Sequence, residues 1–303
     1  MFPTRSESAV RAGGWRRRGR AAAVGALLVL AAALTWSRMS GPAPSSATGR
    51  TLTVATWNMC GVERWNCEGT GSPAVKRRAL SELVARTGAR VVFLQESCAG
   101  DLRAVRARLG ASWHTAFHAY TWRTAAGRTS TVRCAEAGQG VAGTALLSAY
   151  DLSAVAPVPA QQPTVGLRRG ILCATVAALD VRLCVAHLSP PGSDRAHPRW
   201  ELRDDQLRAL VSAVPARRTV FGGDLNVDPP AAHNPAAWVW PAEPYRAYEE
   251  CDQRSASSLY GRPTHRSRHK IDYLFTGLPR AGCSVRDTGA SDHYALVLRV
   301  RTR

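Results

Sequence analysis

The chain has 303 residues, of which 45% are hydrophobic and 20% charged, and its formal net charge is +18 at pH 7. This is the composition of a globular rather than a disordered chain, and its length allows a sizeable core in one or two domains. Residues 51–303 alone hold 32 basic and 21 acidic residues, and this excess indicates either a solubilising surface or a polyanionic partner: nucleic acid, phospholipid head groups or a phosphorylated small molecule.

Residues 1–50 have the pattern of a targeting segment. Four arginines between Arg16 and Arg20 precede an uncharged apolar run, residues 21–36, and a Pro/Ser/Ala stretch follows it. A bilayer span needs about 20 residues and a signal core roughly 7 to 15, so this run of 16 residues is compatible with a cleaved signal peptide and with an uncleaved anchor in the membrane. Either one predicts export of residues 51–303, which would be secreted or held at the cell surface.

The cysteines agree with export. All eight lie in the exported part: Cys60, Cys67, Cys98, Cys134, Cys173, Cys184, Cys251 and Cys283. An even number in a secreted chain predicts disulfides, and four pairs allow 105 connectivities. Two pairs follow from local geometry: Cys173 with Cys184 on neighbouring strands, and Cys60 with Cys67 across a small loop. The absence of a CxxC motif argues against zinc or thiol redox chemistry.

The first half of the exported part alternates strand and helix signals. A β-rich run over 51–58 comes first. Ser72 and Pro73 then have the form of a helix N-cap and first position for a helix that Gly88 ends. A buried strand over 90–96, a helix over 100–110 and a strand over 140–148 follow.

The second half continues the alternation. Strands are predicted over 171–179 and 181–188. A helix over 198–214 would place Trp200, Leu207, Leu210, Val211 and Val214 on one face before Pro215 stops it. The last predicted strands cover 218–226, 270–277 and 294–300. Without an internal linker or repeat, these elements predict a single α/β domain of sheets packed together with helices outside.

Polar groups stand where six of these segments meet a loop: Asn58, Gln95 with Glu96, His187, Asp224 with Asn226, Asp272, and Asp292 with His293. Each alone is an ordinary turn or strand end, and an Asp-x-Asn after a strand is more often an Asx-capped turn. Strand ends that meet at one sheet edge would collect these groups into a single pocket. Gly222 and Gly223 would then let the backbone approach a phosphate, and Asp224 and Asn226, at i and i+2 of an extended segment, would face it together.

The ordered motifs TWN, QE, AHL, GGDLN, KIDYLF and SDHYAL resemble the endonuclease/exonuclease/phosphatase superfamily, which has the deoxyribonuclease I-like fold, over nearly all of residues 51–303. The resemblance implies a four-layer α/β sandwich in which two packed mixed β-sheets are flanked by helices. It also implies metal-dependent hydrolysis of phosphoesters, with residues 51–303 as the catalytic domain behind the N-terminal signal or anchor.

The resemblance also implies roles for individual residues. Glu96, with Asn58 and Asp292, would hold Mg²⁺ or Mn²⁺, because a hard cation prefers oxygen ligands. His293 would be the general base or would orient the attacking water, with Asp272 fixing its tautomer. Asp224 would position the nucleophile, Asn226 would donate to a phosphate oxygen, and His187 would stabilise the charged transition state. Arg169 matches a phosphate-contacting arginine of the family more loosely and is equally compatible with a solvated surface residue.

The substrate expected is nucleic acid, DNA before RNA, cleaved by a monomeric endonuclease. The basic run over 261–270 could track a phosphate backbone or could be a solvated loop; its members are Arg262, His265, Arg266, Arg268, His269 and Lys270. A phospholipid phosphodiesterase such as a sphingomyelinase is the alternative, with Trp238, Trp240 and Tyr245 as its membrane-inserting aromatics. A non-catalytic binding or toxin-like module is a third reading, against which the intact polar set argues. The sequence does not decide whether a structural Ca²⁺ is present.

Overall fold

Strand β1 (Thr51–Asn58) is buried on both of its faces, and this shows how the layers are stacked. Leu52 and Val54 face a hydrophobic cluster shared by two sheets, whereas Ala55 and Trp57 face a second cluster that includes helix residues. The computed structural model describes residues 50–302, except residues 63, 64, 66, 68, 232, 256 and 257. They belong to one compact unit.

Two six-stranded mixed sheets pack against each other. The first has the strand order β14 (Arg280–Arg286), β15 (Ala295–Arg301), β1, β2 (Val91–Cys98), β6 (Ala142–Ser148) and β3 (His114–Ala119). The second has the order β12 (Glu249–Glu250), β13 (Asp272–Thr276), β11 (Thr219–Asp224), β10 (Val181–His187), β9 (Gly170–Val176) and β7 (Leu152–Val158). A small third sheet contains β5 (Thr129–Thr131), β4 (Thr121–Arg123) and β8 (Gly166–Arg168).

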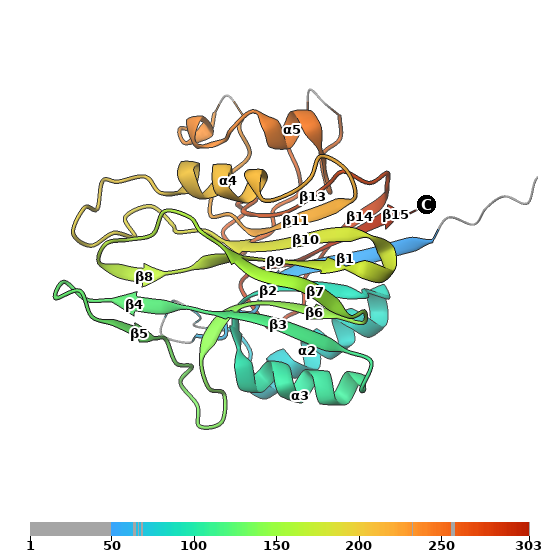
Figure 1. Ribbon diagram of the computed structural model, residues 1–303, viewed down its shortest axis with the longest axis horizontal. Coiled ribbons are helices and arrows are strands. Elements are labelled where there is room, and N and C mark those ends of the chain that lie inside the picture. The colour runs from blue at the N-terminus through green and yellow to red at the C-terminus, as the bar shows by residue number, and fades with distance from the viewer. Residues whose placement is uncertain are drawn as a thin grey trace, which may run out of the picture. The chain divides into compact units, whose positions relative to one another are not determined.

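Helices cover the outer face of each large sheet. Helices α2 (Pro73–Thr87) and α3 (Ala99–Leu109) lie below the sheets in Figure 1, and α4 (Arg203–Ser212) and α5 (Glu243–Ala247) lie above them. Two short 3₁₀ helices, η1 (Ala177–Leu179) and η2 (Ala237–Val239), complete the described elements. The four-layer α/β sandwich predicted from the sequence is confirmed.

Helix α2 begins and ends where its sequence indicates. The Ser72 side chain accepts a hydrogen bond from Val75 N, Pro73 occupies the first turn, and Gly88 ends the helix in the left-handed conformation with φ = 68°.

The predicted helix over 198–214 is too long. Helix α4 spans only Arg203–Ser212, so Trp200 and Val214 lie outside it, and Trp200 is 46% exposed. The Glu201 carboxylate accepts hydrogen bonds from Leu202 N and Arg203 N, which satisfies main-chain donors at the helix start. The predicted strand over 171–179 is also too long, because η1 takes its last three residues.

All eight cysteines form disulfides. The pairs Cys60–Cys67 and Cys173–Cys184 are those expected from the sequence, and Cys98–Cys134 and Cys251–Cys283 complete the set. The predicted signal or anchor, residues 1–50, lies outside the described part of the chain except for Arg50. Among the residues described, no helix is long and apolar enough to cross a membrane.

Candidate active site

The ends of β10, β11 and β13 bring three predicted site residues into one row of the second sheet. His187 is paired in register with Asp224, and Asp224 with Asp272. Glu96, Arg169, His187, Asp224, Asn226, Asp292 and His293 line a cleft of about 820 Å³. Asn58 and Asp272 lie behind its wall, nearly or fully buried, and contact Asp224 and His293 respectively. All nine predicted residues therefore belong to one site.

His293 is held by a buried carboxylate. Its Nδ1 lies 2.9 Å from Asp272 Oδ2, and its Nε2 lies 3.9 Å from Asp224 Oδ2. Burial alone would lower the pKa of His293, but the charge and hydrogen bond of Asp272 and the charge of Asp224 outweigh it and raise this pKa to about 10. The imidazole is therefore a cation at neutral pH in the structure as described.

Asp224 lies at the centre of the site. Its Oδ2 accepts a hydrogen bond from Asn58 Nδ2 at 3.0 Å, and its Oδ1 accepts one from Asn226 N at 3.0 Å. Burial raises the pKa of this carboxyl to about 6, although the charge of His293 opposes the shift. Asp224 is thus ionised at neutral pH and can accept a proton.

His187 is neutral and connects Arg169 to Tyr120. Burial lowers the pKa of His187 well below its usual value, and the charges of Arg169 and His293 lower it further. Its Nε2 accepts a hydrogen bond from Arg169 Nε at 3.1 Å, so the neutral ring carries its proton on Nδ1, which lies 2.7 Å from Tyr120 Oη. Arg169 therefore lies in the cleft and is not a surface residue surrounded by solvent.

Glu96 is a buried carboxylate near the positive charges of the cleft. Burial raises its pKa to about 7, although Arg169 and His293 oppose this shift. It has a positive φ of 48°, and its main-chain N donates to Tyr120 Oη at 3.1 Å. The sulfur atoms near it belong to the Cys60–Cys67 disulfide and are not metal ligands.

The donor atoms fit a hard divalent cation. Glu96 and Asp292 supply carboxylate oxygens to the cleft. Asn58 Oδ1 already accepts from Cys60 N at 2.9 Å, which leaves its second lone pair for a metal. Burial would raise the pKa of Asp292, but the His265 hydrogen bond and the His293 charge lower it to about 2, so Asp292 is anionic. The assignment of these three residues as ligands stays a prediction.

The structure corrects the explanation of the GGDLN motif. An added Cβ on Gly222 would lie 2.0 Å from Tyr273 O, and one on Gly223 would lie 2.0 Å from Ala186 O, so these glycines are required by close strand contacts and not by phosphate. Asn226 has a φ of 53°, so the segment is not extended there. Its Nδ2 donates to Leu188 O at 2.9 Å, which means that the amide braces the loop.

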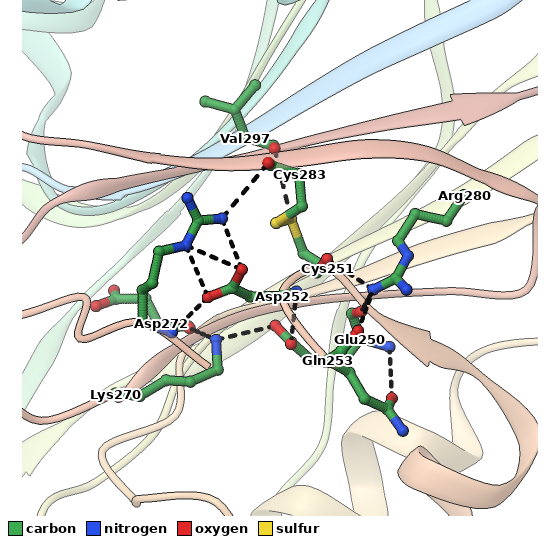
Figure 2. The surroundings of a disulfide bond; sticks show 10 residues. Glu250, Cys251, Asp252, Gln253, Lys270, Asp272, Arg280, Cys283 and Val297 are labelled. Carbon is green, nitrogen blue, oxygen red and sulfur yellow. Dashed lines mark hydrogen bonds and ion pairs between the residues drawn. A yellow bond between two sulfur atoms is a disulfide. The ribbon is translucent and has the colours of Figure 1, made fainter. Parts of the chain in front are cut away.

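The basic run over 261–270 is only partly available to a ligand. Lys270 is buried and its Nζ pairs with Glu250 Oε1 at 3.1 Å, as Figure 2 shows beside the Cys251–Cys283 disulfide. Arg262 pairs with Asp252. Arg266 and Arg268 are exposed, and the structure records no ion pair for either among the described residues.

The sequence analysis missed two residues of the site, Tyr120 and Arg203, and gave His265 only as part of the basic run over 261–270. Tyr120 follows β3 without any distinguishing pattern, yet its hydroxyl contacts His187 and Glu96. His265 Nε2 lies 3.3 Å from Asp292 Oδ2, and a histidine beside the SDH motif could have been sought in the segment before Asp272. Arg203 donates to Asn226 O at 2.6 Å.

Residues 55–293 match the profile of the Endonuclease/Exonuclease/phosphatase family. The chain belongs to this family. Enzymes of the family are divalent-metal-dependent phosphodiesterases and phosphatases, generally with Mg²⁺, and this chain has their phosphoesterase fold. No curated protein matches the chain.

Several solved structures share the fold at low identity. The human Nocturnin catalytic domain with bound sulfate anion is 17% identical with a TM-score of 0.58, covering 82% of this chain and 93% of that one. Humanized D. rerio TDP2 is 18% identical with a TM-score of 0.56, covering 82% and 98%. A family protein from Leptotrichia buccalis is 14% identical with a TM-score of 0.55, covering 82% and 99%. At these identities the likeness supports the fold alone.

Proposed function

We propose that this protein is an exported, monomeric, divalent-metal-dependent nuclease that hydrolyses phosphodiester bonds with an activated water. The observation that carries the proposal is the buried row of Asp272, Asp224 and His187, completed by His293 at 2.9 Å from Asp272. Such buried, mutually perturbed ionisable groups in a cleft are typical of a catalytic centre.

The ionisation states suggest which residue takes the proton. Asp224, ionised above about pH 6, can accept a proton from a water bound between it and His293. His293, charged because Asp272 raises its pKa to about 10, orients that water and stabilises negative charge on the phosphate. Of the two roles predicted for His293, these states favour the orienting one over the general base.

The other side of the cleft would bind the phosphate. Arg169 presents its guanidinium there with His187 behind it, and because His187 is neutral it is a poor general acid. Glu96, Asn58 and Asp292 would hold Mg²⁺ or Mn²⁺, which supplies a Lewis acid that neutralises developing charge. His187 donates directly to phosphate only when its proton moves to Nε2.

Nucleic acid is favoured over lipid by what the molecule exposes. Of the three aromatics of the predicted membrane hairpin, Trp240 is buried and Tyr245 packs against the same cluster, so only Trp238, 64% exposed, could enter a bilayer. The basic excess of residues 51–303 favours a polyanion. The four disulfides support an oxidising location, extracellular or at the cell surface, reached through the N-terminal signal or membrane anchor.

A plasmid-nicking assay tests this proposal. The purified protein should nick plasmid DNA with Mg²⁺ or Mn²⁺ and stop when EDTA is added. Asp224→Ala and His293→Ala should each lower the rate by at least about a hundredfold. His114 and Asp151 form an exposed His–Asp pair at 3.1 Å, so His114→Ala and Asp151→Ala are matched controls that should leave the rate unchanged.

Two outcomes would contradict the nuclease. Intact plasmid with rapid release of phosphocholine from sphingomyelin would replace it with a lipid phosphodiesterase. Folded protein that is silent on DNA, RNA, lipid and small phosphodiesters would indicate a non-catalytic module.

A further inference from the structure

The small third sheet and the loop beside it gather unpaired positive charge next to the cleft. We call residues 121–133, 163–169 and 193–200, which include β4, β5 and β8, the basic wing; Figure 1 shows its three strands together at the left of the domain. The segments 121–133, 163–169 and 193–200 contain seven arginines and one acid, Asp194. The Asp194 carboxylate is buried and accepts hydrogen bonds from Thr164, Ala196 and His197, so no carboxylate is exposed in these segments.

The arginines near the protein surface fall into two groups: some pair with a carboxylate, whereas others, such as Arg266 and Arg268, have no such partner among the described residues. Arg86, Arg208, Arg218 and Arg262 each pair with a carboxylate. Among the residues that the structure describes, no ion pair is recorded for the wing members Arg123, Arg128, Arg133, Arg168, Arg195 and Arg199. Their charge is therefore available to an external anion.

The wing is continuous with the cleft. Tyr120, directly before β4, contacts His187, and β8 runs into Arg169, which lines the cleft. Pro190 and Pro191, just before residues 193–200, line the cleft too. Thr121 is paired with Arg168 in the small sheet, which places Arg123 diagonally from Arg168 on the same face. The Arg195 guanidinium lies over Trp122, on the other face of this sheet, and Arg195 N donates to Val165 O beside the edge strand β8. A polyanion that contacts all three arginines would thus cross the β8 edge on its way to the phosphate bound by Arg169.

Aromatic rings accompany the charge. The Arg195 guanidinium lies 4.5 Å over the Trp122 ring, and Trp200, 46% exposed, stacks on His197 with ring centroids 3.7 Å apart. Arginine and exposed indole together are the means by which proteins hold unpaired bases and their phosphates. The large exposed apolar residues of the described chain, Val155, Trp200, Trp238 and Tyr260, come from four separate segments, whereas a membrane surface would require one continuous patch.

We infer that the basic wing binds a single-stranded stretch of polynucleotide leading into the active site, with Arg123, Arg168 and Arg195 on its phosphates and Trp200 against a base. This inference rests on the proposed nuclease function and names the form of its substrate. It replaces the segment 261–270 as the principal track for the strand.

The salt dependence of binding tests the phosphate contacts. Binding of a fluorescein-labelled oligothymidylate to the full protein is measured by anisotropy in EDTA, so that hydrolysis does not interfere. Each phosphate contact to a single strand contributes a slope of about 0.7, so three contacts make the affinity fall roughly twentyfold between 50 and 200 mM salt. The triple variant Arg123→Gln/Arg168→Gln/Arg195→Gln should lose the part of the salt dependence of binding that these three contacts contribute. Its hydrolysis of bis(p-nitrophenyl) phosphate should be unchanged.

The control variant loses the same number of positive charges at the β14 edge of the first sheet, outside the wing. Arg286→Gln/Arg299→Gln/Arg301→Gln, on β14 and β15, should retain the salt dependence. Equal losses in the two triple variants would overturn the inference, because the effect would then be general electrostatics. A triple wing variant that loses binding to phosphatidylserine vesicles but retains oligonucleotide binding would replace the strand with a lipid surface.

Trp200 tests the base contact. Trp200→Ala should weaken oligothymidylate binding by about fivefold or more and leave duplex binding unchanged, because stacking requires an unpaired base. Equal effects on single strand and duplex would overturn the single-strand assignment. If the oligonucleotide binds through the wing but is never cleaved when metal is added, the proposed nuclease function is contradicted and the wing inference stands. If the oligonucleotide is cleaved and the wing variants bind it as the wild type does, the wing inference is overturned and the nuclease function stands.

Discussion

The Tyr120 hydroxyl connects the two sides of the cleft. It contacts His187 Nδ1 at 2.7 Å and Thr144 Oγ1 at 3.0 Å, and it accepts from Glu96 N at 3.1 Å. Because the Nδ1 partner decides which ring nitrogen carries the proton, Tyr120 is a positioning residue for His187 and, through it, for Arg169.

Tyr120→Phe should therefore lower kcat/KM for a small phosphodiester by about tenfold to a hundredfold, the usual cost of losing a supporting hydrogen bond. Thr144→Val is the control, because it removes another bond to the same hydroxyl and leaves the His187 contact. Similar losses in kcat/KM for both variants would show that the contact of Tyr120 with His187 has no role beyond that of the other hydrogen bonds to this hydroxyl.

The ionised side chain of Glu96 destabilises the folded state of the metal-free protein. Its pKa is raised from 4.5 to about 7, so the folded state binds the proton more tightly than the unfolded state and loses stability as the pH rises through this window. Glu96→Gln should stabilise the protein in EDTA at pH 8 by about 3 kcal/mol and have no effect at pH 4. Urea unfolding at the two pH values measures this difference. If Glu96→Gln lowers the free energy of unfolding at pH 8, the buried charge of Glu96 does not destabilise the folded protein.

At the scale of single residues, the sequence predicted the groups that end strands and missed those that reach the site from elsewhere. His187, Asp224 and Asp272 end or begin neighbouring strands, so in-register pairing brings them together. Tyr120 comes from the segment between β3 and β4, and no local pattern shows that its hydroxyl contacts a strand 67 residues away. The role of Gly222 and Gly223 was misread because it depends on the carbonyls of neighbouring strands.

At the scale of elements, burial decides what could be predicted. The eight interior strands of the two large sheets were all expected, and the four edge strands β14, β3, β12 and β7 were all missed. The edge strand β7 has largely exposed residues, and β14 has mostly intermediate ones, so neither shows the apolar run or alternation that marks a buried strand. The short strands β4 and β5 of the basic wing were missed for the same reason, and β8, although mostly buried, has only three residues and so shows no pattern.

The loop closed by Cys60–Cys67 is an element that serves the site. Cys60 N donates to Asn58 Oδ1, Gly61 N donates to Glu96 O at 2.9 Å, and Trp65 lines the cleft. Cys60→Ala/Cys67→Ala should lower stability by about 2–3 kcal/mol, the amount expected for a short loop, and should also lower kcat/KM.

A second disulfide of similar loop length separates these two effects. Cys173→Ala/Cys184→Ala, within the sheet, should cost a comparable amount of stability and leave kcat/KM of the folded protein unchanged. Both variants are compared well below their unfolding temperatures. Equal activity in the two would show that the Cys60–Cys67 loop does not hold the site.

For the whole molecule, a bound metal should relieve repulsion at the cleft and so stabilise the entire fold. The acidic groups Glu96 and Asp292 come from separate parts of the chain, so a cation held between them binds the folded state only. At a hundredfold excess over its dissociation constant such a ligand adds about 2.7 kcal/mol, which for a domain of this size raises Tm by roughly 5–10 °C.

The Tm of the wild-type protein should thus rise when Mg²⁺ replaces EDTA, and the rise should shrink as the pH falls below 7, because Glu96 must lose its proton to bind the ion. Glu96→Gln should have the same Tm in both conditions. Differential scanning calorimetry at pH 8 and pH 6 measures all of these values. An undiminished Mg²⁺ effect in Glu96→Gln would place the metal elsewhere in the cleft and leave the raised pKa of Glu96 without a functional consequence.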